Sequence, residues 1–171
     1  IGGIIVAVIA VAAVVIAIVA DIENGYKKPV ESMASAIEEA DLEMFFDSIA
    51  DERVIQLKGE DLLKLYFRVL FDYIEYECGR DYNVSVEYGN KERFGKDKIE
   101  EAVENCREKG VVYDAGKMKY LHKVGVTMTA QGDGGEVKVF DGEVFVAKYK
   151  GEWKIIDLGL EFECEEQLTD F

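Results

Sequence analysis

The stretch MKYLHKVGVTMT, residues 118–129, alternates apolar and polar side chains along most of its length. A period of two residues is typical of a β-strand with one buried face, because successive side chains point to opposite sides of a sheet. One face is predicted to carry Met118, Tyr120, His122, Val124, Val126 and Met128. The other face is predicted to carry Lys119, Lys123, Thr127 and Thr129. This pattern predicts that the second half of the chain is a β-sheet.

Three further strands are predicted on the two sides of this one. A strand over 136–149 follows it, with a bulge or a break at Asp141-Gly142. Lys150-Gly151 then turns the chain into a last strand over 152–158. Upstream, residues 82–88 alternate in the same way and predict the first strand.

The first half of the chain shows apolar residues at helical spacing instead. Pro29 suits the first residue of a helix, and Asp41 suits the N-cap of a second, short one. Residues 60–78 give the longest helical pattern, and apolar side chains cover most of its circumference, which predicts a central helix. Asp97-Lys98-Ile99-Glu100 has the form of a capping box, and Gly110 ends the helix that it starts. Helices followed by strands predict an α+β fold, with helices packed on an antiparallel sheet of about four strands.

Residues 1–20, IGGIIVAVIAVAAVVIAIVA, contain no charged and no hydrogen-bonding side chain. A helix of this length is about 30 Å long, which matches the hydrocarbon core of a bilayer. We therefore expect a single transmembrane helix. The alternatives are a buried core helix, a cleaved signal peptide, or the N-terminal helix of a processed pilin, although type IV pilins carry glutamate where this chain has Ile5.

The rest of the chain divides into a linker over 21–28, an α+β domain over 29–158 and an acidic tail over 159–171. All 35 acidic and 20 basic side chains lie outside the apolar segment, so this part carries the whole formal charge of −15. That balance argues against nucleic-acid binding and disfavours contact with anionic lipids, so we expect the domain to stand off the membrane. The small-residue pair Gly3 and Ala7 predicts at most a weak self-association of the span.

Four stretches of the chain carry a resemblance to a known family: residues 26–30 (YKKPV), 36–49, 94–97 (FGKD) and 146–156 (VAKYKGEWKII). The last is the most specific, with a strand, a glycine turn and a tryptophan on the returning strand. They resemble extracytoplasmic domains of the cystatin-like, nuclear-transport-factor-like cone superfamily, which occur behind single spans in Gram-positive membrane proteins, often after a cytoplasmic zinc ribbon. The resemblance implies a curved sheet wrapped around helices, one open end, and a location outside the cell. It implies no catalytic residue, and a zinc ribbon would lie before Ile1.

Candidate chemistry in the sequence is sparse. His122 is the only histidine, and its place on the apolar strand face is typical of a core residue. An enzyme would use it, or a buried carboxylate such as Asp72 or Glu75, as a general base in the mouth of the cone. No catalytic triad, phosphate-cradling loop or metal-ligand spacing is found, so we expect no catalytic residue, no metal and no cofactor.

The three cysteines do not have the spacing of a zinc site. Their odd number leaves at least one thiol free or paired between chains. Cys78 and Cys106 each close a predicted helix and are candidates for neighbours, while Cys164 lies in the tail.

The hairpin near the end of the domain is predicted to be structural. Gly151 makes the turn, and Trp153 shares a strand face with Ile155 because the two alternate. The row that Trp153 is expected to meet across the hairpin consists of Phe145, Ala147 and Tyr149. Trp153 is therefore interpreted as a packing residue and not as a ligand platform.

These observations favour a non-catalytic binding or sensing domain, tethered to the cell membrane by residues 1–20 and located outside the cell. Its partner would be another protein or a small ligand. Two alternatives stay open: a structural subunit of the envelope or of a filament, and a small-molecule enzyme that uses the cone pocket.

Overall fold

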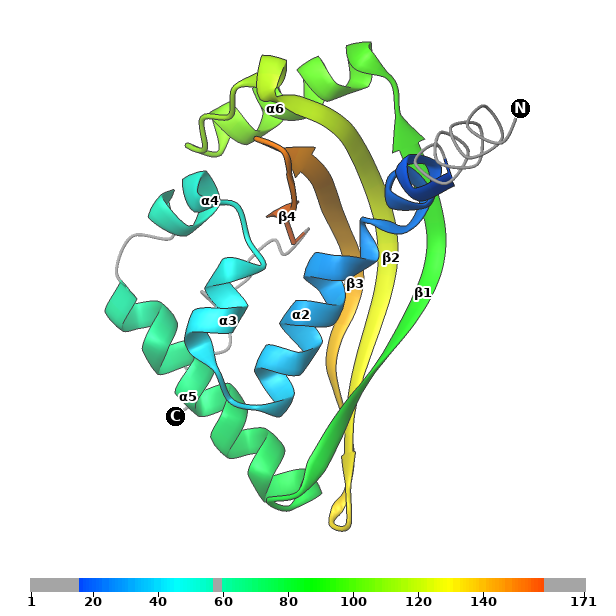
Figure 1. Ribbon diagram of the computed structural model, residues 1–171. Helices are drawn as coiled ribbons and strands as arrows, with labels where there is room; N and C mark the ends of the chain where they lie inside the picture. The colour runs from blue at the N-terminus through cyan, green and yellow to red at the C-terminus, as the bar shows by residue number, and fades with distance from the viewer. Residues whose placement is uncertain (1–15, 57–59, 159–171) are drawn as a thin grey trace, which may run out of the picture.

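The computed structural model describes residues 16–56 and 60–158. Residues 16–24 are helical. Four further helices follow, and the strands come after them (Figure 1). In chain order they are α2 (Lys27–Glu38), α3 (Leu42–Asp47), α4 (Asp51–Gln56), α5 (Glu60–Cys78), β1 (Tyr82–Phe94), α6 (Lys96–Glu108), the 3-10 turn η1 (Ala115–Lys117), β2 (Met118–Gly132), β3 (Gly135–Tyr149) and β4 (Glu152–Asp157). The four strands form one antiparallel sheet in the order β1-β2-β3-β4. The predicted α+β class, with its four-stranded curved sheet, is confirmed.

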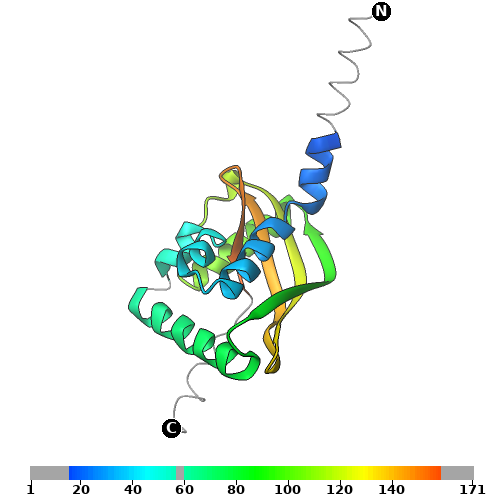
Figure 2. The ribbon, with the colours of Figure 1, turned by 60° about the horizontal axis from the view of Figure 1, so that its bottom comes forward.

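The sheet is covered by helices on both faces. α2, α3 and α5 lie against the inner side of its curve, and α6 lies against the other side near one end (Figures 1 and 2). Val146 belongs to the core under α2, while Ala147, the next residue of β3, belongs to the core under α6. Because neighbouring residues of a strand point to opposite faces, the two cores are separated by the sheet.

The predicted N-terminal cap is correct for α3 and wrong for α6. Asp41 is the N-cap of α3, as predicted: its Oδ1 accepts hydrogen bonds from the backbone N–H groups of Glu43 at 2.9 Å and Met44 at 3.0 Å. The capping box predicted at Asp97 is wrong. α6 begins directly after β1 with Gly95 as its N-cap, which has no side chain to cap the helix, and Asp97 lies in the first turn.

α5 has the predicted bounds but not the predicted surroundings. Phe67, Ile74 and Cys78 are buried on one side of the helix. Its opposite side is exposed, and it carries Leu65, Tyr66, Val69, Tyr73 and Tyr76. The expectation of a central helix is therefore wrong, because α5 lies at the border of the helical layer and has the sheet on one side only (Figure 1).

The register of the sheet corrects the predicted bulge. Met128 pairs with Phe140 and Thr129 pairs with Lys138, so Val139 is the extra residue of β3. Gly142 stays in register, and the absence of a side chain there makes room for the Phe140 ring, which would lie 3.3 Å from a Cβ.

The hairpin between β3 and β4 also differs from expectation. Lys150 and Gly151 both have positive φ, 52° and 96°, as a two-residue hairpin turn requires. Tyr149 then pairs with Glu152, and Trp153 pairs with Lys148. The expected row of Phe145, Ala147 and Tyr149 is wrong, because a two-residue turn places Trp153 opposite the even-numbered residues of β3. Trp153 and Ile155 do share one core, as predicted.

The outer edge of β4 is not free. Ala50 donates its backbone N–H to the carbonyl of Ile155 at 2.9 Å, and Ile155 donates its own to the carbonyl of Ser48 at 2.9 Å. The segment between α3 and α4 therefore acts as a short parallel partner of β4, across Ile49 and Ile155.

Within the residues that the structure describes, no helix is both long enough and apolar enough to cross a bilayer. Most of the expected span, residues 1–15, lies outside them, as do the acidic tail over 159–171 and Cys164 in it. The part of the expected span that is described, residues 16–20, is helical and exposed throughout.

Candidate functional site

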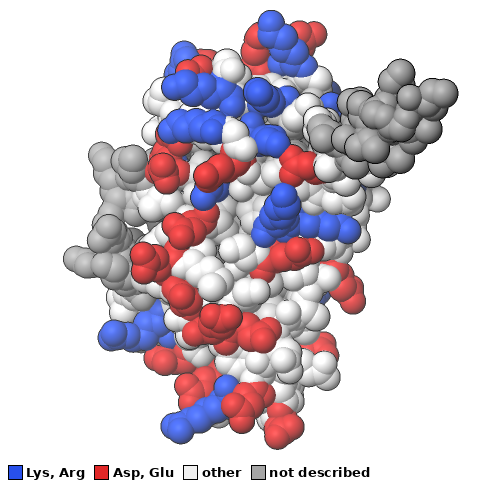
Figure 3. All heavy atoms as spheres, in the orientation of Figure 1, with Lys and Arg blue, Asp and Glu red and all other residues white. Residues whose placement is uncertain are grey.

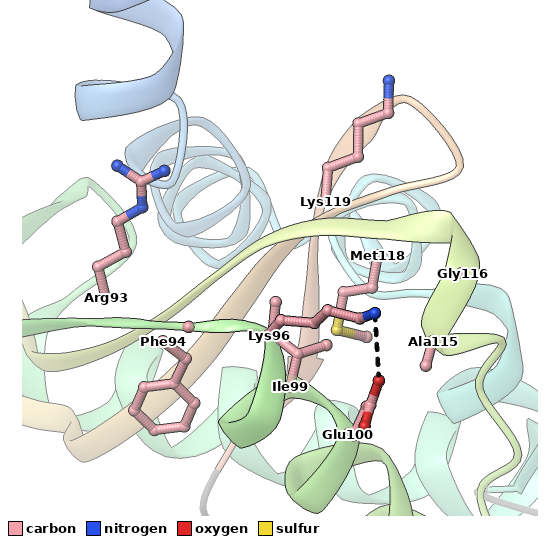
Figure 4. Close-up of a pocket in the computed structure, with 10 residues that line it drawn as sticks. Arg93, Phe94, Lys96, Ile99, Glu100, Ala115, Gly116, Met118 and Lys119 are labelled. Carbon is pink, nitrogen blue, oxygen red and sulfur yellow. Dashed lines mark ion pairs between the residues drawn. The ribbon is translucent and has the colours of Figure 1, made fainter.

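A pocket of about 750 Å³ opens where the end of β1, the start of α6, η1 and the start of β2 meet (Figure 4). The adjacency of β1 and β2 brings residues from these separate segments together, because Phe94 pairs with Leu121 in the register of the two strands. The pocket is lined by Arg93, Phe94, Gly95, Lys96, Ile99, Glu100, Ala115, Gly116, Met118 and Lys119. It is larger than a second cavity beside α6, of about 350 Å³.

The rim of this pocket is basic although the protein is acidic. Arg93 and Lys119 make no ion pair with a described residue, and they extend to the same side in Figure 4, away from Phe94 and Ile99. The Nζ of Lys96 lies 3.9 Å from Oε1 of Glu100, a loose contact between exposed groups. Basic side chains also gather near the upper end of the face shown in Figure 3, and acidic ones dominate its lower part. The charge of −15 is therefore unevenly distributed over the surface.

The wall of the pocket is apolar. Ile99 and Met118 are buried, and Phe94 is half-buried against the core under α6. Gly95 adds no side chain, so the first turn of α6 keeps its backbone N–H groups uncapped at the pocket. These apolar side chains face the core under α6, whereas the Arg93 guanidinium lies over Tyr120 on the other face of the sheet.

A second feature lies close by, where the helical residues 16–24 join the domain. The carboxylate of Asp21 accepts hydrogen bonds from the ammonium groups of Lys148 and of Lys28, the latter at 3.0 Å, and from Nε1 of Trp153 at 3.3 Å. These bonds, with Lys148 as the strongest cause, lower the pKa of Asp21 to about 2. Gly25 allows the close approach, since a Cβ at this position would overlap the Trp153 indole. We call Asp21, Gly25, Lys148 and Trp153 the tether joint.

The pocket and the tether joint are connected by aromatic rings. The guanidinium carbon of Arg93 lies 5.2 Å from the centre of the Tyr120 ring. The Tyr120 ring is stacked on the ring of Trp153, with 6.1 Å between the centroids and 20° between the planes. Arg93 is therefore linked through Tyr120 to Trp153, the only tryptophan of the chain.

His122 lies beneath the tether joint, on the apolar strand face that the sequence predicts. Its ring is buried between Tyr26, at 5.5 Å, and Trp153, at 5.7 Å. Neither ring nitrogen makes a hydrogen bond within the described part of the chain. Burial lowers the pKa of His122, and the positive charges of Lys91 and Arg93 add to this effect, so the ring is neutral at pH 7.

The two carboxylates considered as alternative general bases are not buried. Asp72 and Glu75 are exposed on α5, and Glu75 accepts a hydrogen bond from Nε of Arg80 at 2.9 Å. The expectation that they are buried is wrong, because α5 has only one covered side.

The cysteines also lie apart. Cys78 belongs to the core under α2 and Cys106 to the core under α6, and both are free thiols. Cys106 borders a second cavity of about 350 Å³ beside the ion pair of Arg53 with Asp157, whose Nη2 and Oδ1 are 3.3 Å apart. Burial, with the negative charge of Asp157, raises the pKa of the Cys106 thiol, so it stays protonated. No cluster of metal-binding side chains occurs among the residues that the structure describes.

The sequence interpretation did not single out Arg93, Lys96 or Lys119. Part of the signal was present, because residues 91–98 (KERFGKDK) hold four bases in an acidic chain. Lys119 was assigned only to the polar face of a strand. Its approach to the other two depends on the pairing of β1 with β2, which no local pattern reveals.

Comparison of the chain with protein-family models, with curated proteins and with solved structures finds no significant match. The resemblance to the cone superfamily therefore stays a prediction.

Proposed function

We propose that this protein is a non-catalytic binding domain that is tethered to the cell membrane by its N-terminal apolar segment and located outside the cell. Its binding site is the pocket that Arg93 and Lys119 border. The observation that carries this proposal is that Arg93 and Lys119 border one pocket and make no ion pair with a described residue, in a chain with a formal charge of −15. No carboxylate of the described residues forms an ion pair with either side chain, and the Arg93 guanidinium instead lies over the Tyr120 ring.

The tether is supported by residues 16–20, which continue the unbroken apolar run of residues 1–15. They are helical and exposed, and Ile16, Ile18 and Val19 each expose more than half of their surface. An exposed apolar helix surface of this kind is stable against lipid or another apolar partner. Directly after it, the tether joint fixes the helix to the domain through Asp21.

The absence of catalysis is supported by the state of the candidate groups. His122 is neutral and buried, and the alternative general bases Asp72 and Glu75 are exposed on α5. Cys106 is held as the thiol, which is a weak nucleophile.

A second candidate function, a structural subunit that assembles through its surface, is favoured by one observation. The exposed side of α5 presents an apolar stripe at spacings of three and four residues, formed by Tyr66, Val69, Tyr73 and Tyr76. Such spacing is typical of a helix that packs against another helix.

Membrane topology tests the tether. The full chain should fractionate with membranes, and protease added to intact cells should digest the domain. A domain that is protected in intact cells but digested in inside-out vesicles would place it in the cytoplasm.

Ligand binding tests the pocket. Full chain purified in an uncharged detergent should carry or take up a small molecule that native mass spectrometry detects. The double variant Arg93→Gln/Lys119→Gln should lose it. The control Arg80→Gln/Lys138→Gln removes the same charges far from the pocket and should keep it. Equal occupancy in both variants would show that the pocket is not the site.

A further inference from the structure

We infer that α5 binds α5 of a second copy of this chain, antiparallel to it, with the two-fold axis of the pair at the level of Phe71. This inference rests on the second candidate function and goes beyond it, because it names the partner, the direction and the register. It is carried by the exposed apolar side of α5, by the symmetry of that side and by the charges beside it.

The apolar side of α5 faces away from the fold. α5 lies at the border of the helical layer, and its buried side is already in contact with the core (Figures 1 and 2). Spacings of three and four residues place its exposed apolar side chains in one stripe along the helix. The stripe consists of Leu65, Tyr66, Val69, Tyr73 and Tyr76. A contiguous exposed apolar surface of this kind marks a contact with another protein.

The stripe has nearly the same pattern in both directions along the helix. Tyr66 and Tyr76 lie five residues before and five after Phe71. Val69 and Tyr73 lie two residues before and two after it. A two-fold axis at this level brings each tyrosine of the outer pair next to the other in the partner, and Val69 next to the partner's Tyr73. Because a two-fold interface requires a surface that complements itself, this pattern favours a second copy as the occupant.

Charges along one side of the stripe complement each other in the same arrangement. Arg68 and Asp72 are exposed, and neither makes an ion pair with a described residue. They are four residues apart and therefore lie on the same side of the stripe. Glu75, the next acid on that side, already accepts a hydrogen bond from Arg80. Asp72 is thus the carboxylate that is available to a partner.

An antiparallel pair brings these two charges together. In antiparallel helix pairs, each side of the contact faces the same side of the partner helix, and charges there set the direction of pairing. The axis at Phe71 places Arg68 level with position 74 of the partner, which is about 3 Å along the helix from the partner's Asp72. The same contact occurs twice by symmetry.

A parallel pair would do the opposite. Each residue would then lie beside its own copy, so that Arg68 would face the partner's Arg68 and Asp72 the partner's Asp72. Like charges in contact disfavour a complex. The charges therefore select the antiparallel direction.

The contact is small, which sets the expected strength. Stable complexes bury about 800 Å² on each partner. One side of a single helix gives a smaller area, so we expect a reversible dimer that dissociates on dilution. Measurements over a range of protein concentrations are therefore needed.

The first arm tests whether the two charges belong to the contact. Full chain in an uncharged detergent is studied by native mass spectrometry and sedimentation. Arg68→Glu places an acid beside the partner's Asp72, and Asp72→Arg places a base beside the partner's Arg68. Each change acts at two symmetric contacts, so we expect at least tenfold weaker dimerisation in each variant.

The controls reverse exposed charges on α6, which lies on the other face of the sheet. Glu104→Arg and Arg107→Glu should each dimerise like the wild type. Thermal unfolding of all four variants confirms that they are folded.

The second arm tests the direction and the register. Equal amounts of the Arg68→Glu and Asp72→Arg chains are mixed. In the mixed dimer, the introduced glutamate lies beside the introduced arginine, and the unchanged Asp72 lies beside the unchanged Arg68. Both contacts are attractive again, so we expect mixed dimers to form about as readily as wild-type dimers. The two variants differ in mass, and native mass spectrometry distinguishes the mixed dimer from both homodimers.

A wild-type chain that stays monomeric at every concentration overturns the inference and leaves the stripe to a different occupant. Single variants that dimerise like the wild type overturn it as well, because the dimer would then use another surface, such as residues 1–20. Single variants that stay monomeric in the mixture contradict the antiparallel register. None of these outcomes depends on the protease or ligand experiments. Assembly through another surface would keep the second candidate function and remove α5 from it.

Discussion

The tether joint and the outer side of α5 use similar residues in opposite ways. At the joint, Trp153 is packed between Tyr120 and His122, and its Nε1 is bonded to Asp21. On α5, Tyr73 and Tyr76 expose 49% and 84% of their surface. The comparison teaches that an aromatic side chain contributes to stability here only where a second layer covers it. The joint should therefore be sensitive to substitution and the outer side of α5 insensitive.

The largest expected effect is that of Trp153→Ala. Removing a buried Trp typically costs about 3–5 kcal/mol, because packing contacts are lost and a cavity is left. Denaturant unfolding of the full chain in an uncharged detergent measures the change. Tyr76→Ala is the matched control on α5 and should stay within about 0.5 kcal/mol of the wild type. A similar loss in both variants would contradict the contrast between the two regions.

Gly25→Ala should come next, with a loss of about 1–3 kcal/mol from overpacking. The new Cβ would overlap the Trp153 indole, so helix 16–24 or the indole must move. Gly95→Ala is the control, since a Cβ there meets nothing within 4 Å. Unfolding midpoints of the two variants, measured side by side, check this prediction; a wild-type midpoint for Gly25→Ala would mean that the joint is loosely packed.

Asp21→Asn should have a smaller and pH-dependent effect of about 1 kcal/mol. The folded-state pKa of about 2 lies below the ordinary value of 3.8, so the carboxylate stabilises the fold fully above pH 4. That stability is lost as the pH falls from about 4 to 2. The difference in unfolding free energy between wild type and variant should shrink over this window. A difference that is constant from pH 6 to pH 2 would exclude ionisation of Asp21 as its cause.

The smallest expected effect on stability is that of Val69→Ser/Tyr73→Ser, within about 0.5 kcal/mol, because both side chains are exposed. The same variant sharpens the comparison in another way. If the second candidate function holds, sedimentation should show that the wild-type chain assembles and that this variant does not. Two identical sedimentation profiles would remove the α5 stripe as a site of assembly.

Local sequence patterns predicted much of the fold because each depends on neighbours in the chain. The alternation over 118–128 gives a strand, Asp41 caps α3, and Gly79, with φ of 88°, follows the last residue of α5. Each of these signals is complete within a few residues.

The wrong predictions concern contacts between segments that are distant in the sequence. The apolar pattern of α5 shows that the helix has more than one apolar side, but not how many layers are available to cover them. Trp153 illustrates this. The alternation that places it on the same strand face as Ile155 can be read from neighbouring residues, but its pairing with Lys148 depends on the length of the turn. Asp72 was expected to be buried for the same reason that α5 was expected to be central.

The candidate site was the least predictable part. Arg93 and Lys96 are close in sequence, but Lys119 reaches them only through strand pairing. Charge composition misled the interpretation as well, since a total of −15 hides the basic rim.

The short parallel contact between Ile49 and Ile155 has a consequence for how the protein behaves at high concentration. An uncovered edge strand is a template for a second chain, and through it proteins aggregate. The segment between α3 and α4 occupies the backbone donor and acceptor of Ile155, so β4 cannot recruit another strand there. At the other edge, the carboxylate of Glu38 accepts a hydrogen bond from the backbone N–H of Val84 at 2.8 Å, and charged side chains follow along β1. Both edges of the sheet are thus protected, and polymerisation by strand addition would first require part of the helical layer to detach.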